Sequence, residues 1–329
     1  MLIADPLSIL LVSIAALALD AWLGEPDWLW SRVRHPVVVI GQAVGWLEEQ
    51  WNRAGDSPSR RRMMGVLTVA LIVLGGGLLA AGLHRLLALI PFGLGIVGEI
   101  VVVAILLAGR SLHEHVAAVR RALDGGGLAA GRAAVALIVG RSPDTLDEAG
   151  VGRAAIESNA ENYADGVIAP LFWFLVLGLP GIVGYKTVNT LDSMIGHRSP
   201  RYRDFGWAAA RLDDVANWPP ARLTALLFVA AAAIVPRTSP VQAIRACLRD
   251  AGRHTSVNAG WPEAAMAGAL DLALAGPRTY GTEAVAGAWM NADGRRDAGA
   301  RDIARSLRLT VVASLLVWTL LIVAGVLMF

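Results

Sequence analysis

Charged residues, lysine and cysteine are all scarce in this chain. Charged side chains make up 17% of the 329 residues and hydrophobic ones 55%. Soluble domains carry roughly 25% charged residues, so the composition predicts a polytopic membrane protein. A single cysteine, Cys247, excludes an internal disulfide framework and a cysteine-based metal cluster. The net charge is +2 without a long basic run, which gives nucleic-acid binding no support.

Several catalytic motifs are also missing. The chain has no G-x-S-x-G nucleophile elbow. Its one lysine, Lys186, lies in GIVGYKT, where Tyr185 breaks the spacing of a phosphate-binding loop, and this excludes a Walker-type ATPase. Lys186 could still contact a phosphate, or it could extend to the membrane interface. His113 and His115 alternate along a helix and face different directions, so a zinc site is not favoured.

Long apolar runs predict an all-α, polytopic integral membrane protein, with about four to six transmembrane or re-entrant helices and cytosolic helical insertions. A helix needs roughly 20 apolar residues to cross the bilayer core. The chain supplies such spans at 6–23, 63–83, 86–109 and 308–329, the second and third joined by His84–Arg85. The N-terminus lacks a basic region, which favours a retained helix over a signal peptide. Residues 221–236 are short and stay undecided.

Arginine placement predicts the orientation. Connections 24–62 and 110–164 carry six arginines each and should face the cytoplasm, with the N-terminus outside the inner membrane. The run 166–185 is broken by two prolines and a glycine. A full crossing would separate the polar groups at its two ends, so we expect a re-entrant hairpin over 166–195. The simplest organisation is one membrane-embedded domain, 1–329, with a cytosolic insertion at 110–164 and a polar core at 157–218.

The polar core places seven carboxylates beside an apolar run. Ionisable groups at membrane depth indicate a site unless they are paired or hydrated. Glu157, Glu161 and Asp165 follow at i, i+4 and i+8, which puts them on one face of a helix. Oxygen-only ligands suit Mg²⁺, and Asp192 with the pair at 213–214 could complete one or two metal positions. Alternatively, Glu157 pairs with the arginine one turn before it and Asp165 caps the following helical segment.

Two further features leave alternatives open. Glu99 lies inside the third span, where it could be functional or could hydrogen-bond a neighbouring helix. His254, Ser256 and Asn258 precede a helix expected to start near Pro262. A polar loop at a helix N-terminus can bind an anion, and the same residues can equally form an ordinary cap.

Four sequence blocks resemble the cobalamin-biosynthesis membrane protein family CobD/CbiB, the adenosylcobinamide-phosphate synthases. They are ESNAENYADGVIAPLF, YKTVNTLDSMIGH, FGWAAARLDDVANWPPARL, and HTSVNAGWPEAAMAGAL with Tyr280–Gly281. Weaker matches are Asp20 with GEP at 24–26, His35–Pro36 and VGRSPDTLDE at 139–148. The chain departs from the family pattern at Glu25, at Ser142–Pro143 after Arg141, at Val257 and over 287–296. The central carboxylates match, and the departures concern substrate contacts around 254–296.

The resemblance implies an amide-forming ligase. The family joins 1-amino-2-propanol or its O-phosphate to a carboxylate of adenosylcobyric acid. ATP with Mg²⁺ would activate that carboxylate as an acyl phosphate. Mg²⁺ binding or proton removal from the attacking ammonium is assigned to Glu157, Glu161, Asp192, Asp213 and Asp214, and phosphate contacts to Lys186 and Arg211. The remaining substrate contacts are assigned to Asn159, Asn162, Asp165, Asn189, Ser193, Asn217, His254, Ser256 and Asn258.

Two functions from other classes compete with the enzyme. One is a non-catalytic membrane sensor, like a distant relative of this family linked to β-lactamase induction. The other is a small-solute transporter. The intact carboxylate blocks favour an enzyme, and the small number of full spans argues against a transporter. The expected partners are the lipid bilayer, the corrinoid and amino-alcohol substrates and other cobalamin-assembly membrane enzymes, with the active site on the cytoplasmic side.

Overall fold

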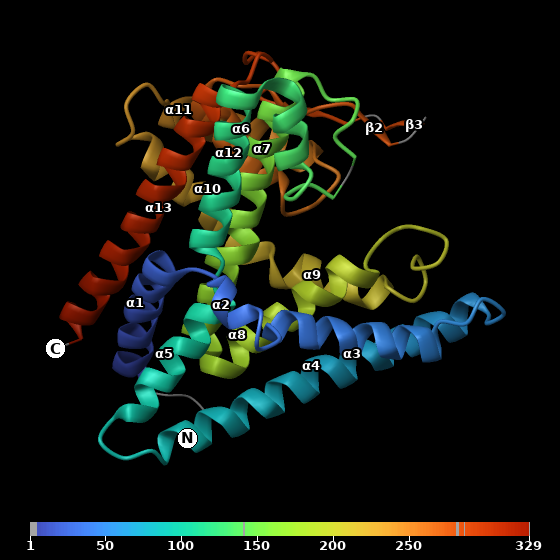
Figure 1. The fold of residues 1–329 in the computed structure, drawn as a ribbon, viewed down its shortest axis with the longest axis vertical. Helices are drawn as coiled ribbons and strands as arrows, with labels where there is room; N and C mark the ends of the chain where they lie inside the picture. Colours follow the sequence, from blue (N-terminus) through green and yellow to red (C-terminus); the bar gives the residue numbers. More distant parts are fainter. Residues whose placement is uncertain (1–4, 141, 281–282, 286, 329) are drawn as a thin grey trace. The chain divides into compact units, whose positions relative to one another are not determined.

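The computed structural model describes residues 5–140, 142–280, 283–285 and 287–328, and most of these residues are helical (Figure 1). Five helical stretches among them are long and apolar enough to cross a membrane: Pro6–Leu23, Pro58–Ala88, Leu94–Val135, Glu148–Ile195 and Ala300–Leu327. This confirms the predicted class of a helical, polytopic membrane protein. The chain divides into two compact units. The first combines residues up to 108, 169–217 and from 321 onward, and the second combines 109–168 and 218–320.

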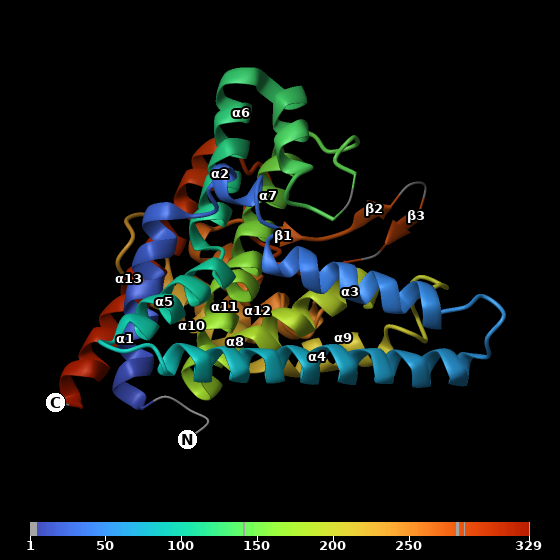
Figure 2. The ribbon, with the colours of Figure 1, turned by 60° about the horizontal axis from the view of Figure 1, so that its bottom comes forward.

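The first unit holds helices whose starts are set by local capping. Its elements are α1 (Pro6–Leu23), α2 (Asp27–Trp30), α3 (Pro36–Trp51), α4 (Pro58–Ala88), α5 (Leu94–Leu106), α8 (Ala169–Ile195), α9 (Trp207–Ala216) and the end of α13 (Ala300–Leu327). Helices α1, α3 and α4 each begin with proline, preceded by a capping side chain from Asp5, His35 or Ser57. Proline fits this position because the first N–H of a helix has no partner within it. Figures 1 and 2 show α3 and α4 side by side and antiparallel.

The core of the first unit holds the connection between α8 and α9 in place. Leu191 and Phe205 are buried in one cluster with residues from α3 and α4. At the other side of this connection, the Arg201 guanidinium donates from Nε and Nη2 to the two carboxylate oxygens of Glu48, each at 2.8 Å. Such a two-point ion pair fixes orientation as well as distance. The connection between α8 and α9, the two helices that carry several predicted site residues, is therefore anchored to α3.

The boundary between the second and third predicted spans is wrong. Helix α4 continues through His84 to Ala88, and the chain turns only at residues 89–93, where Phe92 and Gly93 have positive φ angles of 60° and 71°. His84 stays inside a helix because its Nδ1 lies 3.2 Å from Oε1 of Glu99 on α5. The third span is consequently shorter than 86–109, and Glu99 contacts a neighbouring helix, as one alternative expected.

Helix α8 folds back on itself at Gly178. Its φ of 65° and ψ of −151° are not helical and suit a residue without a side chain. Ala169 and Tyr185, on opposite sides of Gly178, belong to one buried cluster together with Ala216. A straight helix would separate Ala169 and Tyr185 by about 24 Å. The backbone thus forms a helical hairpin within the range 166–195, and insertion of this hairpin into the bilayer stays a prediction.

The second unit combines helices with short strands. It contains α6 (Gly109–Val135, interrupted at Gly127), α7 (Glu148–Tyr163), the π-helical turn η1 (Ala164–Ile168), α10 (Trp218–Ala232), α11 (Pro240–Asp250), the 3-10 turn η2 (Ala251–Arg253), α12 (Gly260–Leu270) and most of α13. Strands β1 (Leu274–Ala275) and β4 (Trp289–Met290) pair antiparallel, as do β2 (Arg278–Tyr280) and β3 (Glu283–Val285). The sequence analysis did not anticipate these strands. Helix α10 has 15 residues, about 22 Å, and is too short to cross a bilayer core.

Helix α7 is held along α13 by hydrogen bonds and close packing. Asn159 Nδ2 donates to Ser306 Oγ at 3.1 Å, and the hydroxyls of Tyr163 and Ser314 lie 2.9 Å apart. A side chain at Gly152 would collide with the carbonyl oxygen of Ala298, so glycine permits this approach. These contacts fix the position of Glu157, which lies between them on α7.

Candidate functional site

The predicted site residues occur in both units. The first unit contains Lys186, Asn189, Asp192, Ser193, Arg211, Asp213, Asp214 and Asn217. The second contains Glu157, Asn159, Glu161, Asn162, Asp165, His254, Ser256 and Asn258. Within each unit the structure brings some of these side chains together.

In the first unit, a chain of hydrogen bonds joins α8 to α9. The Tyr185 hydroxyl donates to Asn217 Oδ1 at 2.8 Å, and Asn217 Nδ2 donates to Asp213 Oδ2 at 3.0 Å. The second oxygen of Asp213 is buried without a hydrogen-bond partner. Most buried polar atoms have a partner, so an exception indicates a missing proton, water or ion. Asp213 is therefore the centre of this candidate site.

The electrostatics around Asp213 point to the same conclusion. The pKa of Asp213 is raised to about 7, mainly by burial and also by the neighbouring carboxylates of Asp192 and Asp214, against the opposing effect of hydrogen bonds from Asn217 and Asn189. Arg211 lies 3.6 Å from Asp214, which compensates part of this negative charge. A carboxyl in this environment can take up a proton near neutral pH, or its ionised form can be stabilised by a cation.

The donor atoms of this carboxylate cluster suit Mg²⁺. Mg²⁺ is commonly bound by one or two carboxylates, with water and substrate phosphates in its other positions. Across the residues that the structure describes, no group of three or more His, Cys, Asp and Glu side chains is arranged to hold a metal ion. A Mg²⁺ ion here would take at most two protein carboxylates, and the assignment stays a prediction.

Two residues near the lysine were not assigned to the site from the sequence. Tyr185 precedes Lys186 in a quoted block, but its hydroxyl matters only once α9 lies beside α8. His35 caps α3, and its Nε2 lies 3.2 Å from the Ile105 carbonyl oxygen. Burial lowers the pKa of His35, the charge of Glu25 and the hydrogen bond with Ile105 oppose this, and the positive charge of Lys186 adds a smaller lowering effect. The only sequence signal for His35 was its place in a weak family match.

Other predicted residues of the first unit are bonded within their own helix. Ser193 is exposed, and its hydroxyl donates to the Asn189 carbonyl oxygen at 2.9 Å. The side chain of Asn189 acts on Asp213 and lowers its pKa. Asn189 therefore belongs with the carboxylate cluster, whereas nothing in the structure directs Ser193 toward it.

In the second unit, the three carboxylates at i, i+4 and i+8 have different surroundings. Glu157 is buried and its Oε1 accepts the Ala275 N–H at 2.8 Å. Glu161 is exposed. Asp165 lies in the π-helical turn η1, so the regular α-helical spacing assumed for it is wrong. The sequence spacing alone could not show that the α-helix ends at Tyr163.

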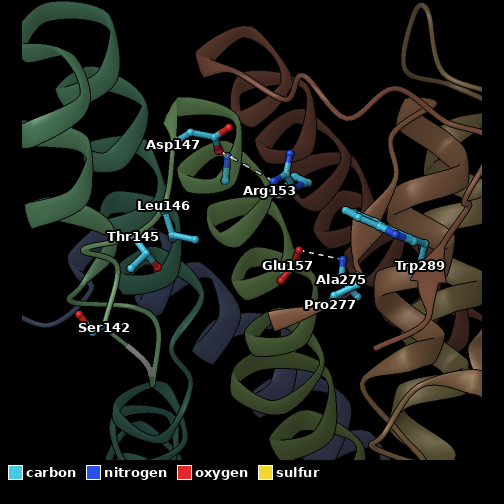
Figure 3. A pocket seen from close by; sticks show the side chains of 10 residues that line it. Ser142, Thr145, Leu146, Asp147, Arg153, Glu157, Ala275, Pro277 and Trp289 are labelled. Atoms are coloured by element: carbon cyan, nitrogen blue, oxygen red, sulfur yellow. Dashed lines mark hydrogen bonds and ion pairs between the residues drawn. The ribbon is translucent and has the colours of Figure 1, made fainter. Parts of the chain in front are cut away.

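Glu157 lines a pocket of about 360 Å³ at the start of α7 (Figure 3). The lining residues are Ser142, Thr145, Leu146, Asp147, Gly150, Arg153, Glu157, Ala275, Pro277 and Trp289. Arg153 donates from Nη1 to the Arg296 carbonyl oxygen, and its Nη2 lies 4.0 Å from Asp147 Oδ1. The pocket therefore presents a buried carboxylate and a guanidinium one helical turn apart. From the sequence, Arg153 was expected only as a partner of Glu157, and Asp147 and Trp289 were not assigned to a site.

The loop at 254–258 is occupied by its own structure. The Ser256 hydroxyl accepts the N–H groups of Asn258 and Ala259, and Asn258 Oδ1 accepts from Arg222 Nη1 at 2.8 Å. His254 Nε2 lies 3.7 Å from a carboxylate oxygen of Glu263. These contacts order the loop before α12, but the N-cap residue of α12, Ala259, makes no side-chain capping hydrogen bond, so the expected ordinary cap is not formed and the anion site stays a prediction.

The remaining predicted contacts lie on α7. Asn159 is buried and donates to α13, which is a structural role. Asn162 is exposed, and its amide donates back to the Ser158 carbonyl oxygen at 2.9 Å. Arg141 and Gly281, quoted for the family resemblance, lie outside the described residues.

Comparisons with known proteins agree on one family. The sequence model described as CobD/Cbib protein matches residues 13–310. A protein named Cobalamin biosynthesis protein CobD from Brucella suis is 53% identical over 302 residues, which is 91% of each chain. Proteins of the same name from Rhizobium meliloti and Rhodobacter capsulatus are 52% and 48% identical, each over 90% of this chain and 90% and 91% of their own. No solved structure matches the chain.

Proposed function

The chain belongs to the CobD/Cbib protein family, and on that premise we propose that it is a cobinamide or cobinamide-phosphate synthase of cobalamin biosynthesis. The reaction joins the amine of 1-amino-2-propanol, or of its O-phosphate, to a side-chain carboxylate of adenosylcobyric acid. The product is an amide. A free carboxylate is a poor acyl donor, so activation by ATP and Mg²⁺ through an acyl phosphate is part of the proposal.

The observation that carries this proposal is the buried oxygen of Asp213 that lacks a partner within a group of three carboxylates. Amide formation begins from an ammonium, which must lose a proton before its nitrogen can attack the acyl carbon. It ends with phosphate leaving that carbon. The Asp213 cluster, which can hold a divalent cation, fits the second requirement, and a carboxylate beside the amine fits the first.

The side chains of this chain take the following parts. Asp213 and its neighbours Asp192 and Asp214 would hold Mg²⁺. Glu157 accepts the proton of the ammonium. Asn217, fixed by Tyr185, orients the Asp213 carboxylate. In the second unit, Glu157 and Arg153 line a pocket of a size suited to a small molecule and too small for a corrinoid. We assign the amine substrate to that pocket, with its ammonium on Glu157.

The proposal also includes a place in the cell. Five apolar helical stretches fit a multi-pass membrane protein. The arginine-rich connections predict that the start of α7, and with it the pocket, faces the cytoplasm across the inner membrane. ATP is available on that side. The corrinoid and amino-alcohol substrates would then also be bound from the cytoplasm.

Purified protein in detergent provides the direct test. It is incubated with adenosylcobyric acid, ATP, Mg²⁺ and either amine, and the corrinoid is analysed by mass spectrometry. We expect a mass increase corresponding to one attached amine. Asp192→Ala and Asp214→Ala should lose turnover while keeping the elution profile of the folded protein. Asp204→Asn, a carboxylate of the same unit beside Arg203, is the matched control and should retain turnover.

An unmodified corrinoid with both amines under all conditions would overturn the proposed reaction. Near-normal turnover after removal of Asp192 or Asp214 would leave the reaction in place and overturn the role assigned to these residues.

A further inference from the structure

The large apolar side chains of α11 are exposed to the surroundings, whereas a helix of a globular domain normally buries such side chains. Its buried face consists of Ala243, Ala246, Cys247 and Asp250, while Val241, Ile244 and Leu248 are 54%, 45% and 78% exposed. The inner residues of α11 are small because this helix packs closely against α12. A side chain at Gly268 of α12 would collide with the backbone of α11. Close packing against α12 does not explain why the outer positions, at i, i+3 and i+7, are aliphatic.

The start of α11 is tied to the polar beginning of α13, and its end is tied to β4 and its neighbourhood. Before α11, the Arg237 carbonyl oxygen accepts from Arg305 Nη2 at 2.6 Å. After it, Asp250 accepts the Asn291 N–H, and the Asn291 amide donates to the Leu272 carbonyl oxygen. Arg305 Nη1 donates to the carbonyl oxygen of Leu270, two residues before Leu272.

These contacts place the start of α11. Its first residue, Pro240, follows three positions after Arg237, so α11 begins beside Arg305 of α13. The uninterrupted apolar part of α13 begins after Arg308. Helix α11 therefore begins at the level where this candidate membrane span starts.

Positive charge lies beside the apolar stripe of α11. Arg245 is exposed next to Ile244, and no hydrogen bond or ion pair of its guanidinium exists within the described part of the chain. Arg237 and Arg308 are exposed at the same level. Exposed aliphatic residues flanked by arginines at a membrane boundary are typical of helices that lie in the interface of an anionic bilayer.

We propose that α11 is an interfacial helix. The stripe formed by Val241, Ile244 and Leu248 inserts among the acyl chains next to the headgroups, and Arg245 binds the phosphate groups of anionic lipids. This helix would fix the height of the second unit at the membrane, which none of the spans alone determines. The proposal does not depend on the proposed reaction.

The test uses a single fluorescent label on the full protein in lipid nanodiscs. Cys247 is replaced by alanine, and an environment-sensitive dye is attached to Leu248→Cys. The matched control is Glu148→Cys, an exposed position at the start of α7 in the same unit. If Cys247→Ala does not fold, Cys247 stays in place, because burial raises the pKa of its thiol to about 12 and slows its labelling.

We expect lipids with a quencher near the headgroup to quench the label at Leu248 at least about threefold more than the control label, and iodide in the buffer to quench it less. Phosphatidylglycerol should strengthen this difference relative to phosphatidylcholine, and Arg245→Gln should remove the strengthening. Equal quenching of both labels by iodide would overturn the proposal. So would shielding of the Leu248 label from both quenchers, since protein would then cover α11.

Discussion

The clearest prediction concerns the stability of the protein when Asp213 loses its charge. The folded protein raises the pKa of Asp213 to about 7, whereas the carboxyl of an unfolded chain titrates near 3.8. At pH 8 this difference corresponds to about 4 kcal/mol that disfavours the folded state. Asp213 is not completely buried, so water screens part of this effect and we expect about 2 kcal/mol.

The direction of the pKa shift of Asp213 determines the pH range over which the stability of the protein changes. Well below pH 3.8, Asp213 is neutral in both the folded and the unfolded state and disfavours neither. As the pH rises toward 7, the unfolded chain ionises first, so the free energy of unfolding falls. Asp213→Asn removes this loss while its amide oxygen can still accept from Asn217. The variant should be more stable than the natural protein at pH 8, and this advantage should disappear as the pH falls well below 3.8.

Thermal unfolding in detergent with a chelator, followed by tryptophan fluorescence, measures the effect. The expected increase at pH 8 is about 2–5 °C for a chain of this size. Mg²⁺ should stabilise the natural protein more than Asp213→Asn if it binds at this cluster. An equal or lower melting temperature of the variant at pH 8 would refute the claim that the buried charge of Asp213 is uncompensated.

Three further predictions test the fold and the pocket. Arg201→Ala should destabilise the protein by about 2 kcal/mol and Glu48→Ala by about 1 kcal/mol, because only the first leaves a buried carboxylate without its partner. Urea unfolding of both variants measures the two effects, and the reverse order would contradict this reasoning. Gly178→Ala should lower stability by about 1–3 kcal/mol, since alanine is strained at φ 65° and ψ −151°, while Gly184→Ala, which has open space, should not. Glu157→Gln should raise the KM for the amine about tenfold, because the variant loses a charge-assisted hydrogen bond to the ammonium, and it should leave the KM for the corrinoid unchanged. An unchanged KM for the amine would show that the pocket is not the amine site.

The carboxylate cluster illustrates how much a sequence reveals of a site. Asp192, Asp213 and Asp214 were found from their types and their position beside an apolar run. Their mutual effect on one pKa required the contact between α8 and α9. Arg153 and Trp289 were not assigned to a site, because they are 136 positions apart and meet only when β4 lies beside the start of α7.

The sequence by itself determined the class of this protein, its long apolar helices, the family to which it belongs and the carboxylates that deserve mutation. These properties depend on composition and on periodicity within one helix, which local physics controls. Only the tertiary structure decided that α8 reverses at Gly178, that α4 continues through His84, and that Glu157 faces a pocket while Glu161 faces outward. Each of these depends on which element packs against which residue, and that is settled by contacts between segments far apart in the chain.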